Sequence, residues 1–293
     1  MKAARLVALV SAGATLLGTT AMPATAAVKP STVPIVRTIG TYPTASTWLT
    51  IHRGSRTLHT WVLYPRTAPA RPLPVVVFAH GWNSSPSVYA ALLVAFASAG
   101  VVVVAPTSPG LARGTVIADN AAADAAQIAD LPVAEAGAAA ARLPVTLDPH
   151  QVVFIGHSDG GDDVATSAVN PAVRDLGVAG YVDLSGGSTS ANARFLRTNV
   201  RPLLCVAAFA DEYGNWARAS AMYAQVRPPK ALLGIGRGET HLPPFAVDSA
   251  FHRRIWQAVL EFSAWTITGD PRTWSAFVQL ATAPGLSFTA ASN

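Results

Sequence analysis

Serine, aspartate and histidine, the three side chains of a nucleophilic catalytic triad, occur in an informative order along this chain. Ser158 is the centre of a Gly-x-Ser-x-Gly pattern at 156–160, Asp211 follows it, and His241 follows Asp211. A serine hydroxyl is a weak nucleophile, so it needs a base within hydrogen-bonding reach and an acid that orients the base. These residue types in this order predict acyl transfer through a covalent intermediate on Ser158.

The residues around Ser158 are typical of a nucleophile elbow, a sharp turn between a strand and a helix. The apolar run 152–155 precedes the turn and predicts a buried strand, and the residues after the turn can begin a helix. Gly156 and Gly160 remove side chains that would collide where the strand and the helix pass closely. The backbone N–H of Asp159, at the helix N-terminus, is then predicted to point at a developing oxyanion.

His241 is the predicted base among the seven histidines of the chain. It lies in the loop that follows the last predicted strand and comes after the acid in the sequence, whereas His252 lies on the predicted C-terminal helix. An imidazole titrates near neutral pH, so it can take the serine proton and return it to the leaving group. Structural roles are expected for the histidines in other predicted elements, which are His52, His59, His150 and His252.

Asp211 is the predicted acid, because it follows a predicted strand and precedes His241. A carboxylate there would hold the correct imidazole tautomer and stabilise the imidazolium. Asp183, at the end of the preceding predicted strand, is the alternative acid. Glu212 and Glu239 are interpreted as solvated carboxylates of loops.

Apolar runs that alternate with helical stretches define the elements that must position these residues. Such an alternation predicts a mostly parallel sheet covered by helices, with ligands bound outside the carboxyl ends of its strands. The candidate residues all come directly after predicted strands, so they are expected at one edge of the sheet. Strands are expected near 48–52, 58–65, 74–79, 101–106, 152–155, 178–184, 202–209 and 231–235, and helices near 85–99, 118–142, 161–168 and 248–266.

The chain resembles the α/β-hydrolase superfamily, and within it the small esterases of the dienelactone hydrolase, chlorophyllase and cutinase-like polyester hydrolase type. The resemblance rests on His80-Gly81-Trp82, on the elbow 156–161, on Asp211 and on the late His241. It implies an α/β-hydrolase fold with a sheet of about eight strands and helices on both faces. It also implies a single catalytic domain over residues 28–293.

The same resemblance implies roles for further residues. The backbone N–H of Trp82 takes the place of the second oxyanion donor, beside that of Asp159, and His80 and His157 take packing roles. The indole of Trp82 either lines the substrate pocket or packs beneath its loop. Only about 18 residues separate Leu184 from the next strand, too few for a large cap domain, so an open site is expected.

Aromatic residues near the predicted catalytic loops are candidates for contact with substrate. Tyr213, Trp216 and Phe245 either form an apolar wall of the pocket or belong to ordinary loop packing. The chain differs from secreted polyester hydrolases at 184–187, where it lacks their tryptophan. Its single cysteine, Cys205, also excludes their C-terminal disulfide.

The N-terminus predicts export of the protein. Residues 1–27 combine Lys2 and Arg5, an apolar stretch and small residues at the end, as in a secretory signal peptide that is cleaved near Ala26 or Ala27. An uncleaved anchor helix is the alternative, but the apolar stretch is short for a membrane span. The expected product is a secreted, monomeric protein without stable membrane insertion.

Charge and composition argue against several classes of ligand. The formal charge of +5 falls to about +3 once the signal peptide is removed, and the basic residues form no stripe that would suggest nucleic-acid binding. Asp159, Asp162 and Asp163 cluster where a helix is expected to begin, which favours acids at its positive end over a metal site. No phosphate-binding or nucleotide-binding glycine pattern follows a strand, so no cofactor and no metal are predicted.

The sequence therefore predicts a secreted serine esterase that cleaves small or surface-bound carboxylic esters. Alternatives on the same fold are a polyesterase or lipase and an acyltransferase that uses an alcohol in place of water. A non-catalytic binding protein with an α/β-hydrolase fold is the alternative of a different class.

Overall fold

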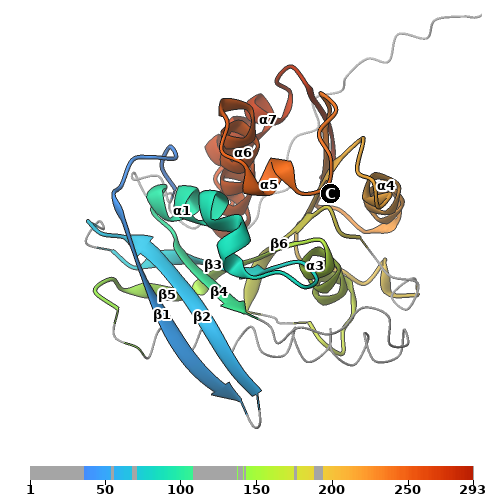
Figure 1. The fold of residues 1–293 in the computed structure, drawn as a ribbon. Helices are drawn as coiled ribbons and strands as arrows, with labels where there is room; N and C mark the ends of the chain where they lie inside the picture. The colour runs from blue at the N-terminus through green and yellow to red at the C-terminus, as the bar shows by residue number, and fades with distance from the viewer. Residues whose placement is uncertain are drawn as a thin grey trace, which may run out of the picture.

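The computed structural model describes residues 36–292 apart from 54–55, 68–70, 108–136, 138–140, 142, 175–176 and 188–193. The predicted signal peptide and most of the helix expected over 118–142 lie outside the described residues. The described chain contains one nine-stranded sheet with the strand order β1-β2-β4-β3-β5-β6-β7-β8-β9 (Figure 1). The strands are β1 (Thr44–Arg53), β2 (Arg56–Pro65), β3 (Leu73–Ala79), β4 (Val102–Thr107), β5 (Leu147–His157), β6 (Val178–Leu184), β7 (Leu203–Ala208), β8 (Lys230–Ile235) and β9 (Leu286–Ala291).

The centre of the sheet is parallel, and its outer strands are antiparallel. β4, β3, β5, β6, β7 and β8 run in the same direction, whereas β2 is antiparallel to both β1 and β4, and β9 is antiparallel to β8. β3 and β7 are buried along their whole length, as continuous apolar runs predict for strands covered on both faces. The sequence predicted about eight strands; the ninth, β9, alternates between more and less exposed residues at the sheet edge.

Helices cover both faces of the sheet. Side chains of β3 alternate between two cores: Val76 and Phe78 pack with α1, α6 and α7, and Val75 and Val77 pack with α3 and α4. In Figure 1, α1, α5, α6 and α7 lie together above the sheet, apart from α3 and α4. The helices are α1 (Ala90–Ser98), α3 (Asp159–Val169), α4 (Asn215–Gln225), α5 (Pro243–Ala246), α6 (Ala250–Thr268) and α7 (Pro271–Ala281).

The helix boundaries follow local capping chemistry. The helix expected near 85–99 begins as a 3₁₀ turn, η1 (Pro86–Tyr89), before α1 continues it. The side chain of Ser249 accepts a hydrogen bond from the backbone of His252, and Gly269 ends α6 with a left-handed conformation. The short helix α5 lies between β8 and α6, in a stretch for which the sequence analysis predicted no helix.

The fold places the candidate residues at one edge of the sheet. The loops after β3, β5, β7 and β8 carry Trp82, Ser158, Asp211 and His241, respectively. No large cap domain covers this edge within the described ranges. Among the helices of those ranges, none combines the length and apolar character that crossing a membrane requires.

Candidate active site

The turn between β5 and α3 holds Ser158 in a strained backbone conformation. Its φ of 59° and ψ of −121° lie outside the regions that L-residues ordinarily occupy. A Cβ atom at Gly156 would overlap the backbone carbonyl of Gly160, so the strand and the helix do pass too closely for side chains there. A Cβ atom at Gly160 would overlap the carbonyl of Ala79 on β3, a neighbour that the sequence did not identify. The sequence of the turn therefore fits the geometry of a nucleophile elbow.

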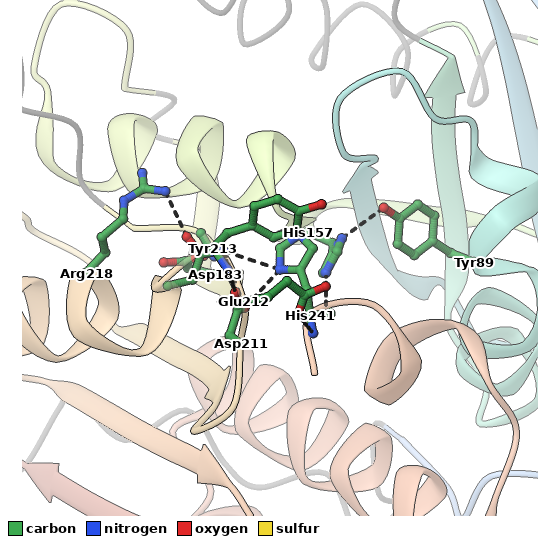
Figure 2. A network of polar contacts seen from close by, with 10 residues as sticks. Tyr89, His157, Asp183, Asp211, Glu212, Tyr213, Arg218 and His241 are labelled. Atoms are coloured by element: carbon green, nitrogen blue, oxygen red, sulfur yellow. Dashed lines mark hydrogen bonds and ion pairs between the residues drawn. The ribbon is translucent and has the colours of Figure 1, made fainter. Parts of the chain in front are cut away.

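His241 and Asp211 are directly hydrogen-bonded. The Nδ1 atom of His241 lies 2.9 Å from Oδ2 of Asp211, and both side chains are buried (Figure 2). Asp211 also accepts hydrogen bonds from the backbone N–H of Tyr213 at 3.0 Å and from the amide of Asn215 at 3.3 Å. Because Nδ1 of His241 faces this carboxylate, Nε2 is the ring nitrogen left to exchange a proton with another group.

The pKa of Asp211 lies below its ordinary value. Burial by itself raises the pKa of this carboxyl group. The hydrogen bond and charge of His241, with the hydrogen bonds from Tyr213 and Asn215, outweigh the effect of burial. Asp211 is therefore ionised at neutral pH and suited to stabilise an imidazolium.

Asp183, the alternative acid, does not contact the imidazole of His241. It lies at the end of β6, where Oδ1 accepts a hydrogen bond from the backbone N–H of Gly186 at 2.8 Å. A Cβ atom at Gly161 would lie 2.5 Å from the same oxygen, so Asp183 is enclosed by backbone. Burial, reinforced by the charge of Asp162, raises the pKa of Asp183 well above its ordinary value. Asp183 faces backbone and has no hydrogen bond to His241, so the geometry favours Asp211 as the acid.

The two glutamates interpreted as solvated loop carboxylates both have partners. Glu212 accepts a hydrogen bond from the backbone N–H of His241 at 3.0 Å. Glu239 lies 3.0 Å from Nε2 of His252 on α6. Glu212 is itself exposed, so the expectation of contact with solvent holds for it, but it also fixes the loop that carries His241.

A charged pair continues the hydrogen bonding behind Asp211. Asn215, whose amide donates to Asp211, accepts a hydrogen bond from Nη1 of Arg218 at 2.9 Å. Nη2 of Arg218 forms an ion pair of 2.7 Å with Asp162 at the start of α3. Asp162, one of the three acids at 159–163, is therefore paired with Arg218 of α4. In the described part of the chain, no group of three or more His, Cys, Asp or Glu residues could hold a metal ion.

A second set of hydrogen bonds reaches His241 from the opposite direction. His157, the residue before Ser158, is buried, and its Nε2 lies 3.1 Å from the backbone carbonyl of His241. Its Nδ1 lies 2.9 Å from the hydroxyl of Tyr89, which in turn accepts a hydrogen bond from the backbone N–H of Gly81 at 3.1 Å. Figure 2 shows Tyr89 and Arg218 on opposite sides of His241.

A cleft of about 600 Å³ brings most of the predicted site residues together. Ser158 and His241 both line it, along with Trp82, Asp159 and Tyr213, and Asp211 lies behind His241. The Trp82 side chain is 42% exposed, which favours a position in the cleft over packing beneath its loop. The Tyr213 ring packs edge-on against His241, with centroids 4.8 Å apart.

Two of the predicted aromatic contacts are absent from the lining of this cleft. Trp216 packs edge-on against Phe209, with ring centroids 4.6 Å apart, and joins the core beneath α4. Phe245 is buried to 1% exposure, and its ring lies 5.0 Å from that of His157. For these two residues the alternative of ordinary packing fits, because nearness to Asp211 or His241 in sequence does not determine which side of the loop a ring occupies.

The two residues predicted to supply oxyanion donors line the same cleft as Ser158. Asp159 is the first residue of α3, and Trp82 follows Gly81 in the loop after β3. A Cβ atom at Gly81 would lie 3.0 Å from Cβ of Ser158, so this loop passes directly over the serine. Both segments therefore contribute residues to the lining of this cleft.

Sequence reasoning did not assign functional roles to Tyr89, Asn215 and Arg218. In the sequence, Tyr89 was interpreted only as an apolar residue at helical spacing. Arg218 was interpreted as one of many scattered arginines. Asn215 comes four residues after Asp211, and this proximity is the one sequence signal that could have identified it. The partners of Tyr89 and Arg218 are distant in the chain, and their hydrogen bonds become visible only in the structure.

The sheet order, the strained serine turn and the His241–Asp211 pair define a protein of the α/β-hydrolase type. A family model described as Chlorophyllase matches residues 36–185, about half of the chain, and the chain belongs to this family. Family membership indicates a hydrolase. The match includes Trp82, Ser158 and Asp159 and ends before Asp211 and His241. No curated protein matches the chain.

Proposed function

We propose that the protein is a serine hydrolase that cleaves carboxylic esters through an acyl-enzyme intermediate. The observation that carries the proposal is the 2.9 Å contact between His241 and Asp211, in a cleft that Ser158 also lines. The positive φ of Ser158 supports the proposal, because backbone strain of this kind costs free energy and occurs mainly at functional sites.

In the proposed acylation, Oγ of Ser158 attacks the carbonyl carbon of the ester while Nε2 of His241 takes the hydroxyl proton. Asp211 stabilises the imidazolium that forms. The negative charge on the former carbonyl oxygen is stabilised by the backbone N–H groups of Trp82 and Asp159. The tetrahedral intermediate then collapses, the C–O bond to the alcohol breaks, and His241 returns its proton to the leaving alkoxide.

Deacylation repeats these steps with water in place of the serine hydroxyl. Water loses a proton to His241 as it attacks the acyl carbon, and the second tetrahedral intermediate releases the carboxylic acid. The proton on His241 returns to Oγ of Ser158. The enzyme is restored without a cofactor, and an alcohol that replaced water at this step would give acyl transfer.

The surroundings of the cleft support small or surface-bound esters as substrates. Four large apolar side chains that line it are well exposed, and apolar groups around a few polar atoms are typical of ligand sites. They are Trp82, Val88, Tyr213 and Leu242. We also propose that residues 1–27 are removed on secretion, leaving residues 28–293 as a monomeric catalytic domain.

Hydrolysis of p-nitrophenyl esters of increasing acyl length tests the proposal. The wild-type protein should release nitrophenol with an initial burst, and Ser158→Ala should lose several orders of magnitude in kcat. Ser263→Ala is a matched control, since this buried hydroxyl donates only to the backbone of α6. The dependence on acyl length then separates an esterase from a lipase. Equal inactivity of wild type and Ser158→Ala on every ester would contradict the proposal.

A further inference from the structure

Three hydrogen bonds join Gly81, Tyr89, His157 and the carbonyl of His241 into a continuous chain, here termed the Tyr89–His157 bridge. The bonds measure 3.1 Å, 2.9 Å and 3.1 Å in that order. The side chains of Tyr89 and His157 are both 1% exposed, so water does not compete for these bonds. The hydroxyl of Ser84 also hydrogen-bonds the phenol, which ties a second residue of the loop after β3 to it.

The bridge determines the protonation of His157. A backbone carbonyl can only accept, so Nε2 of His157 carries the hydrogen that faces His241. Burial, and next the charge of His241, lower the pKa of His157 to about 3, so the ring is neutral and Nδ1 is a bare acceptor. The Tyr89 hydroxyl therefore donates to Nδ1 while it accepts from Gly81. Each polar atom of the bridge is paired with a partner of the correct type.

The bridge meets three of the four proposed catalytic segments, all but that of Asp211, within one residue of the reacting group. Gly81 precedes Trp82, whose N–H is the proposed second oxyanion donor. His157 precedes Ser158, and the carbonyl that it binds belongs to His241 itself. The three segments follow β3, β5 and β8, which lie at separate positions in the sheet. A single buried network thus sets the oxyanion loop, the nucleophile and the base relative to one another.

Apolar packing alone does not account for this arrangement. The rings of Tyr89 and His157 do pack, with centroids 5.3 Å apart, but phenylalanine would preserve most of that contact. What phenylalanine cannot supply is a partner for the backbone N–H of Gly81 or a donor to the carbonyl of His241. Those two bonds hold backbone, so they control where the neighbouring reactive groups lie.

We infer that Tyr89 and His157 are positioning residues for ester hydrolysis: the bridge holds the loop of Trp82 and the loop of His241 in the geometry that attack by Ser158 requires. The inference rests on the proposed function. Neither residue touches the reacting atoms in this role. Displacement of a catalytic group by about 1 Å can lower turnover by about 100-fold, so the loss of one buried bond in the bridge should be measurable in kcat.

The experiment compares Tyr89→Phe, His157→Phe and His157→Gln with wild type, using a p-nitrophenyl ester and a fluorophosphonate that labels the reactive serine. Rates are divided by the fraction of labelled sites, so that loss of folded protein is not counted as loss of turnover. Ser98→Ala is the matched control, because its buried hydroxyl accepts from Gly40 N–H and donates to a backbone carbonyl at the far end of α1.

Tyr89→Phe should lower kcat about tenfold and His157→Phe about 10-fold to 100-fold, with KM changed less than about threefold. His157→Gln should retain more activity than His157→Phe, because its amide can still donate to the His241 carbonyl. The kcat of the double variant Tyr89→Phe/His157→Phe should lie within about threefold of the kcat of the less active single variant. Such non-additivity is expected when two residues act as one connected unit. Ser98→Ala should lower thermal stability but leave kcat unchanged.

The outcomes separate the two proposals. If wild type and Tyr89→Phe are labelled at the same rate and share the same kcat, the positioning role is overturned and the proposed function stands. If KM rises and kcat is unchanged, the bridge shapes the binding site without positioning the reactive groups, which also overturns the inference. If wild type neither hydrolyses esters nor reacts with the fluorophosphonate, the proposed function fails and the inference fails with it.

Discussion

The imidazole of His241 has neighbours on two sides, and the two sides differ in charge and in exposure. On one side are Asp211, Asn215 and the partly exposed Arg218, which forms an ion pair with Asp162. On the other side is the Tyr89–His157 bridge, which is neutral and buried. The charged side contacts the ring through Nδ1, whereas the bridge contacts the backbone carbonyl of the same residue.

This difference suggests a division of tasks in catalysis. The proposed reaction alternates His241 between neutral and cationic forms, and only a carboxylate gains from the cationic form. A neutral donor on the backbone contributes little to that change, so it can hold the residue in place in both forms. A base that must move protons benefits from one partner that responds to its charge and another that does not.

Asp211→Asn should have the largest effect of the changes that test this division. An amide cannot stabilise the imidazolium and favours the wrong tautomer of His241, so kcat should fall on the order of 10³–10⁴-fold. Asp183→Asn is the matched control at the alternative acid. Because Asp183 does not contact the imidazole and an amide oxygen can still accept the hydrogen bond from the backbone N–H of Gly186, the amide should be tolerated with a loss of kcat below about fivefold. Esterase kinetics at pH 8 measure both, and a larger loss in Asp183→Asn than in Asp211→Asn would reverse the assignment.

The buried, neutral His157 of the bridge should make the free energy of unfolding depend on pH. The pKa of His157 falls from an ordinary 6.5 to about 3 on folding, so below pH 6.5 the unfolded chain binds the proton more readily. Stability due to the neutral ring is complete above pH 6.5 and is lost as the pH falls toward 3. At pH 4.5 the loss is roughly 2–3 kcal/mol relative to pH 7.

Urea unfolding of wild type and His157→Phe at pH 7 and pH 4.5 measures this loss. Wild type should lose more stability than the variant by that amount, and His80, whose pKa burial also lowers, contributes equally to both. The lowered pKa of Asp211 acts below its ordinary value of 3.8, outside the chosen range. An equal loss of unfolding free energy in the two proteins would show that His157 does not take up a proton when the protein unfolds at pH 4.5.

The contrast between the two sides also explains what the sequence could predict. Continuous apolar runs such as 74–79 determine buried strands, and parallel strands bring their carboxyl ends to one edge, so the places of Ser158, Asp211 and His241 followed from pattern. The strained turn at Ser158 has a local signature in its flanking glycines. These features depend on residues that are close in the chain.

The remaining features depend on contacts between distant residues. Tyr89 and His157 are 68 positions apart, and His157 and His241 are 84 apart, so no local pattern pairs them. Trp216 and Phe245 lie near site residues in sequence, which left both a pocket wall and ordinary packing open, and the structure shows their rings in packed regions. The edge strand β9 is short and only partly buried, so its apolar alternation was too weak to predict it.

Asn215→Leu should have an intermediate effect on the charged side. The substitution removes the amide that donates to Asp211 and leaves this buried carboxylate with fewer hydrogen bonds. We expect kcat to fall about 10-fold to 100-fold, in keeping with the net value of about 1.5–3 kcal/mol for a hydrogen bond to a charged group. The acid limb of the kcat profile should remain, because Asp211 and His241 are both present. A loss as large as that of Asp211→Asn would mean that Asn215 orients the carboxylate on its own.

Arg218→Met should have the smallest effect, and it shows how far the charged side extends. The Arg218 side chain is 37% exposed, and exposed ion pairs contribute about 0.2–1 kcal/mol. We therefore expect a loss of stability below about 1 kcal/mol and a fall in kcat of less than about threefold, both reduced by 0.5 M NaCl because salt screens the pair with Asp162. Urea unfolding and ester kinetics with and without salt measure the two effects. If kcat fell more than tenfold and salt made no difference, Arg218 would act through the hydrogen bond to Asn215, and the charged side would be a connected network as long as the neutral bridge.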